Sequence, residues 1–211
     1  MESALYKIST WIMRMAFVNI LWISFTIIGF VVLGFFPATV AMFTIVRHWI
    51  RGDSDIPIYS TFWNTYKQYF LRANILGIIF AIAGVVLFWD LLFFRDFGGP
   101  IGFVLFFLSI VLALFYLMTA FILIPVIVHY DIKTTEYIKY AFIISSSYPL
   151  HAIYIGLSIY VIFYVTTWVP VIFLFFSGSF LSLVIMRFAY TAFEKIEKKK
   201  ESRAIIETAE Q

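Results

Sequence analysis

The chain alternates long apolar runs with short polar stretches, and its N-terminal part is dominated by one such run. Residues 15–46 carry no formal charge, and a basic segment at 47–51 follows them. A transmembrane helix needs about 20 apolar residues, so this run is longer than one span requires. Because proline removes a helical hydrogen bond, we expect the run to break or kink near Gly34–Pro37.

Four more apolar segments follow and predict further transmembrane helices. With the first run they give spans at about 15–46, 73–94, 101–128, 149–167 and 169–187. Amphipathic stretches at 3–17, 59–72 and 131–148 are typical of helices that lie on the membrane surface. The predicted fold class is therefore all-α: a polytopic membrane helical bundle of about five transmembrane helices. It forms one integral membrane domain over 1–190, followed by a charged tail at 191–211.

The composition agrees with this interpretation and narrows the chemistry. Hydrophobic residues make up 63% of the chain and charged residues 13%, whereas a soluble domain carries roughly 25% charged residues. Cysteine is absent, which excludes a disulfide framework, a thiolate metal site and a cysteine nucleophile. The three histidines lack the spacing of metal ligands, and no phosphate-binding loop or nucleophile-elbow motif occurs. We therefore predict no metal, no cofactor and no enzymatic activity.

Basic residues indicate which loops face the cytoplasm. Lysine and arginine gather in the 47–72 loop, the 129–148 loop and the tail, whereas the connections at 95–102 and 166–170 carry one and none. The positive-inside rule then puts the basic loops and the C-terminus in the cytoplasm. Five spans put the N-terminus outside, which its own two early basic residues oppose, and a broken first span that re-enters is the alternative. Because the basic residues lie at membrane ends, nucleic acid is not an expected partner.

A short internal repeat relates two of the predicted spans. YFLRANILG at 69–77 and YPLHAIYIG at 148–156 match at tyrosine, leucine, alanine and glycine. Each segment follows an amphipathic stretch and opens a span, so the pattern predicts two related units in parallel orientation.

Four polar residues in or beside the apolar runs are candidates for substrate binding: Asn19, Asn74, Asp90 and His151. A polar side chain within the bilayer is costly, which makes each of them a functional hypothesis. The structural alternative for Asn19 is an interhelical hydrogen bond. For Asn74 and His151 it is anchoring at the membrane interface. For Asp90 it is contact with headgroup water or an ion pair with Arg95.

Three motifs in the first part of the chain carry a family resemblance. They are N-x-L-W-x-x-F…G-x-x-P-A-T-x-A over Asn19–Ala41, R-x-W-I-R-G-D over Arg47–Asp53 and F-W-x-x-Y-K-x-x-F over Phe62–Phe70. With them the chain resembles the YesL-like family of small bacterial membrane proteins of unknown function. The resemblance implies a multi-pass protein of the bacterial cell (plasma) membrane. Genes of the family often accompany sugar ABC importers and two-component regulators, which implies a role near carbohydrate uptake.

Two hypotheses about function follow. The first is an accessory or regulatory subunit that associates with another membrane complex, a sugar importer or its sensor, because small residues at 73, 77 and 81 form a ridge suited to helix packing. The alternative is a small oligomeric transporter or channel that uses Asn19, Asn74 and Asp90 along a path. The expected partners are the lipid bilayer together with a transporter or sensor subunit, or further copies of the same chain.

Overall fold

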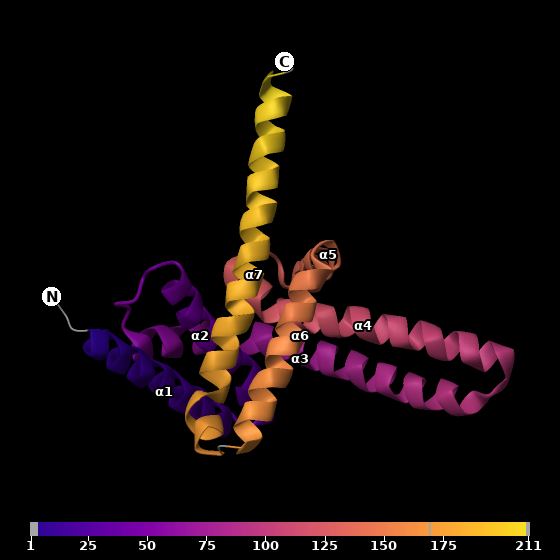
Figure 1. Cartoon of the computed structure of the whole chain (residues 1–211), viewed down its shortest axis with the longest axis horizontal. Coiled ribbons are helices and arrows are strands. Elements are labelled where there is room, and N and C mark those ends of the chain that lie inside the picture. Colours follow the sequence, from indigo (N-terminus) through magenta and orange to yellow (C-terminus); the bar gives the residue numbers. More distant parts are fainter. Residues whose placement is uncertain (1–3, 169, 210–211) are drawn as a thin grey trace.

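The computed structural model describes residues 4–168 and 170–209, and over these residues its regular elements are all helices, without strands (Figure 1). The elements are α1 (Ala4–Ile28), α2 (Val32–Ile50), α3 (Ile58–Phe97), α4 (Gly99–His129), a 3-10 turn η1 (Thr134–Glu136), α5 (Tyr137–Ser147), α6 (Pro149–Trp168) and α7 (Pro170–Ala209). The predicted all-α class is confirmed.

Among the described residues, five helical segments are long and apolar enough to cross a membrane. They are Ile8–Ile28, Val32–Ile50, Ile58–Phe97, Gly99–His129 and Phe175–Lys199. A sixth candidate combines α5 with α6, which meet at a bend of 95°. The predicted multi-pass helical membrane protein is therefore confirmed, although the helices divide the chain differently from the predicted spans. The turn expected at 166–170 includes residue 169, which lies outside the described residues.

The first apolar run folds as two helices rather than one kinked helix. The break lies at Gly29–Val31, where Phe30 and Val31 have φ values of 57° and 63°. A Cβ atom at Gly29 would collide with the main chain of Gly34, so the absence of a side chain lets the two helices approach closely. The break expected near Gly34–Pro37 is wrong, because Pro37 lies inside α2.

The N-terminal part of α1 lies at the same end of the molecule as the loop between α2 and α3. Arg14 donates from Nη2 to Asp55 Oδ1 at 3.0 Å and from Nη1 to the carbonyl of Ser54 at 2.8 Å. The rings of Trp11 and Trp49 meet edge to face, 5.3 Å apart. The chain thus runs away from this end of the molecule through α1 and returns to it through α2. The N-terminal part of α1 and the 47–72 loop therefore lie at one end of the molecule, as a broken first span that re-enters would place them. The side of the membrane on which this end lies stays a prediction.

The amphipathic stretch at 59–72 is continuous with the span that follows it. Together they form α3, a single helix of 40 residues, so the separate surface helix expected here is absent. Phe62 and Tyr66 are buried and their rings pack against Phe25 of α1, at 5.2 and 5.1 Å. The aromatic stripe on this helix therefore faces protein.

The long helices share one packed centre and then diverge. α2 packs against α1, α3, α4 and α7, and the buried residues of these helices form one continuous apolar core. From this centre the α3–α4 hairpin and the α6–α7 pair extend in different directions, and the C-terminal half of α7 continues beyond the other helices (Figure 1). The charged tail is thus helical as far as Ala209.

Two glycines that correspond in the predicted repeat occupy similar contacts. A Cβ atom at Gly77 of α3 would collide with the ring of Phe36, and one at Gly156 of α6 would lie 3.4 Å from the ring of Phe121. In both cases the ring comes from the long helix that precedes the glycine. The repeat itself stays a prediction.

Candidate functional site

Asn19 links α1 to α7 through its side-chain oxygen. The residue is fully buried, and its Oδ1 accepts hydrogen bonds from the main-chain N–H groups of Gly178 at 3.0 Å and Ser179 at 3.1 Å. A Cβ atom at position 178 would lie only 2.8 Å from that oxygen, so glycine permits the contact. We call Asn19, Gly178 and Ser179 the inner amide site. Its amide oxygen is occupied by donors of the chain itself.

Asn74 supplies a hydrogen-bond donor that Pro37 cannot provide within α2. In a regular helix the N–H of residue 37 would donate to the carbonyl of Leu33, but proline has no N–H. Asn74 Nδ2 donates to that carbonyl at 2.9 Å and also to the carbonyl of Phe70 at 2.8 Å. Both amide hydrogens of Asn74 are therefore used in holding α2 against α3.

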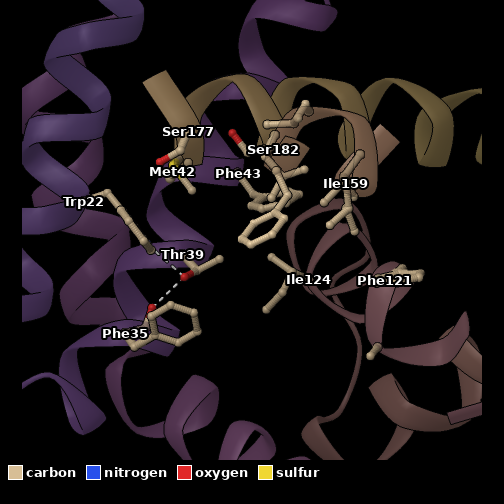
Figure 2. Close-up of a pocket in the computed structure, with 16 residues that line it drawn as sticks. Trp22, Phe35, Thr39, Met42, Phe43, Phe121, Ile124, Ile159, Ser177 and Ser182 are labelled. Atoms are coloured by element: carbon tan, nitrogen blue, oxygen red, sulfur yellow. Dashed lines mark hydrogen bonds between the residues drawn. The ribbon is translucent and has the colours of Figure 1, made fainter. Parts of the chain in front are cut away.

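A cavity of about 410 Å³ lies beside the inner amide site, among α1, α2, α4, α6 and α7. Figure 2 shows Trp22, Phe35 and Thr39 on one side of it and Phe121 and Ile124 on the other. Its volume is within the range of roughly 300–1,000 Å³ that small-molecule sites occupy. Among the described residues, we take this cavity as the leading candidate for a binding site.

The polar groups that line this cavity are mostly engaged by the chain. Trp22 Nε1 donates to Thr39 Oγ1 at 3.1 Å, and Thr39 Oγ1 donates to the carbonyl of Phe35 at 2.6 Å. Ser182 Oγ donates to the carbonyl of Ser179 at 2.8 Å. The remaining wall is almost entirely hydrocarbon and aromatic rings. The cavity therefore offers little to a polar ligand and much to an apolar one.

A second polar group joins α2, α4 and α7 near the end of the bundle from which the tail extends. Arg47 Nε donates to His129 Nδ1 at 3.4 Å, and His129 Nε2 lies 3.2 Å from Glu197 Oε1. Since Nδ1 accepts and the carboxylate needs a donor, the pair of contacts requires a neutral imidazole with its proton on Nε2. The side chain of His129 is 10% exposed and that of Glu197 is 54% exposed. We call Arg47, His129 and Glu197 the charged end cluster.

Aromatic rings surround the charged end cluster. The ring of Phe193 lies 4.5 Å from that of His129, and the ring of Tyr190 lies 5.7 Å from it. Burial, with a smaller contribution from Glu197, raises the pKa of Tyr130 to about 12. The phenol of Tyr130 therefore stays neutral up to strongly alkaline pH.

The other two candidate residues lie apart from these sites. Asp90 is half-buried on α3 and has no hydrogen bond or ion pair with any described residue. Arg95, its expected partner, instead pairs with Asp96 at 2.9 Å. His151 stands at the start of α6 with its ring edge-on to Tyr148, and its buried Nδ1 has no partner among the described residues.

The four predicted residues thus occupy four separate places, and only Asn19 adjoins the cavity. Sequence reasoning missed the charged end cluster, whose contacts join residues 82 and 68 positions apart. One signal was present: Arg47, His129 and Glu197 each follow the apolar part of a helix. The positive-inside rule assigns all three of those ends to one side of the membrane.

The comparisons with known proteins agree with the resemblance in the sequence. A family model described as "Protein of unknown function, DUF624" matches residues 15–91. The chain is 36% identical to the uncharacterized protein YesL of Bacillus subtilis (strain 168), covering 91% of this chain and 90% of the relative. It is 35% identical to YteU of the same organism, covering 89% and 84%, and 30% identical to YesV, covering 92% and 93%.

No solved structure matches the chain. The similarity to the three Bacillus proteins extends over most of each chain. On this evidence the chain belongs to the YesL-like family.

Proposed function

We propose that the protein is an accessory or regulatory membrane subunit that associates with another membrane complex, a sugar importer or its sensor. The observation that carries this proposal is the use of polar groups inside the bundle. The Asn19 oxygen and both amide hydrogens of Asn74 bond to the chain itself. A path for a polar solute needs polar groups that are free to replace water, and the cavity wall offers few.

The projecting part of α7 favours a role in contacting a partner. It extends beyond the other helices (Figure 1) and carries lysine and glutamate in close alternation, with Lys198 and Lys199 exposed. A helix that stands alone in this way buries little surface within its own chain. The charged end cluster joins its base to α2 and α4, so the bundle and the projecting helix are mechanically connected.

The connection to carbohydrate uptake rests on the family resemblance. We assign no catalytic role, because Trp22, Thr39 and Ser182 of the cavity wall are engaged in structural hydrogen bonds. The proposal includes a cell-membrane location with the tail in the cytoplasm, as the distribution of basic residues indicates.

Affinity purification from native membranes in mild detergent, followed by mass spectrometry, tests the proposal. We expect a permease or sensor-kinase subunit in fixed ratio to the tagged protein. The double variant Lys198→Glu/Lys199→Glu should release that subunit, whereas Lys139→Glu, which changes an exposed lysine of α5, should not. Recovery of the tagged chain alone, or of copies of itself alone, would contradict the proposal.

A small oligomeric transporter is the second candidate, and Asp90 is the observation that favours it. A half-buried carboxylate without an ion pair among the described residues is unusual on an apolar helix. If it lines a path between subunits, liposomes that contain the pure protein should transport a sugar or a cation, and Asp90→Asn should slow transport at least tenfold. Transport that is unaffected by Asp90→Asn would remove the basis of this candidate.

A further inference from the structure

We propose that the cavity beside the inner amide site holds one acyl chain of a bilayer phospholipid. The cavity lies among membrane helices, and two of the residues that line it are exposed on the outer surface: Phe35 of α2 is 42% exposed and Phe163 of α6 is 64% exposed. The cavity therefore reaches the lipid-facing surface at these two rings. A chain can enter there while the rest of its lipid remains in the bilayer.

The chemistry of the wall selects hydrocarbon. Thr39 and Ser182 already donate to carbonyls of the chain, and Trp22 donates to Thr39. A polar ligand placed against the remaining apolar wall would lose its hydrogen bonds to water without replacing them. An acyl chain has no such groups to satisfy, and it regains the dispersion contacts that an empty cavity would forfeit.

The shape of the cavity favours a flexible occupant over a partner helix. The cavity offers about 410 Å³, and its shape is set by side chains from five different helices. A flexible chain of single-carbon width fits such a space, whereas a rigid helix does not.

Photocrosslinking in nanodiscs tests this proposal. The probe is a phosphatidylglycerol with a diazirine at the end of one acyl chain, and the labelled peptides are identified by mass spectrometry. We expect label on Met42 or Phe43 of α2 and on Leu181 of α7, which line the cavity. Label confined to the exposed surfaces of the α3–α4 hairpin would show surrounding lipid only and would overturn the proposal.

Two variants on different helices narrow the cavity, so the test remains valid if one of them fails to fold. Ala120→Trp fills it from α4 and Ser182→Met fills it from α7. Label at Met42 should fall at least fivefold in either variant that remains folded. Ala83→Trp, on an exposed position of α3 outside the cavity, should leave it unchanged.

Competition tests whether the acyl chain belongs to a phospholipid or to a free fatty acid. Excess unlabelled phosphatidylglycerol should reduce the label at Met42 at least as strongly as excess free fatty acid of the same chain length. Label that persists in both folded cavity variants, or that only the fatty acid displaces, would overturn the proposal. A failed search for a partner complex bears on the proposed function and leaves this result unaffected.

Discussion

The inner amide site and the charged end cluster hold the same helix, α7, by different means. At the inner site a neutral and fully buried amide oxygen accepts two main-chain hydrogen bonds. At the end cluster Arg47, His129 and Glu197 form a chain of contacts with part of the carboxylate exposed. Burying a neutral amide with its bonds satisfied costs far less than burying a charge. The molecule therefore keeps charges where water can reach them.

The difference bears on the role that we propose for α7 in contacting a partner. The inner site offers no charge whose state can change, so it fixes the position of the helix within the bundle. The end cluster depends on an imidazole with its proton on one nitrogen and on a carboxylate that is half in solvent. A partner that contacts the projecting part of α7 would act on the second site and leave the first intact.

The largest expected effect is at the inner site. Asn19→Leu leaves the N–H groups of Gly178 and Ser179 without an acceptor from α1, and we expect a loss of roughly 1–3 kcal/mol in the free energy of unfolding. Reversible unfolding in mixed detergent micelles measures it. Asn64→Leu replaces an exposed asparagine of α3 and should change stability much less. Equal losses in the two variants would mean that the inner site does not hold α7.

A double-mutant cycle at Pro37 and Asn74 tests whether a second neutral amide plays the same part. Asn74→Leu should cost about 1 kcal/mol, because the carbonyl of Leu33 loses its donor. In a Pro37→Ala background the main chain can supply that donor, so the same substitution should cost clearly less. Additive effects in the cycle, measured by the same unfolding assay, would contradict this account.

At the charged end cluster the effects should be smaller and should depend on salt. Arg47→Met removes the donor to His129, and we expect a loss of about 0.5–1.5 kcal/mol that shrinks as salt concentration rises. Combined with Glu197→Gln, the two substitutions should be non-additive, because both act through the same imidazole. Arg95→Met, which breaks an exposed pair between neighbouring residues, should have almost no effect on stability.

The sequence predicts some features of this fold and not others. The uncharged run at 15–46 predicts membrane helices because only length and apolarity matter there. It does not give the position of the break, because Pro37 is tolerated inside α2 through a donor from Asn74, 41 positions away. Nor does it give the side of the N-terminus, which changes with the number of spans that the break creates.

The same holds for the candidate sites, of which one can be selected from the sequence and the others cannot. Asn19 can be selected from the sequence because it is polar within an apolar run, and the structure adds its bonds to α7. The charged end cluster could not be assembled in this way, since its members come from three helices and each is ordinary for a membrane end. The cavity could not be predicted either, because side chains from five helices define it.

The last expected effect is confined to alkaline pH and concerns Tyr130, beside the charged end cluster. The pKa of Tyr130 is about 12 in the folded chain, against roughly 10 for an unperturbed tyrosine. The folded state therefore holds this proton more tightly, and stability should fall as pH rises from about 10 to about 12. In Tyr130→Phe this contribution is absent, so the decline over that range should be shallower. Tyr59→Phe, which alters an exposed phenol, should retain the slope of the parent protein. If all three proteins lose stability in parallel, the half-buried phenol of Tyr130 is not part of what distinguishes the charged end of α7 from its inner attachment.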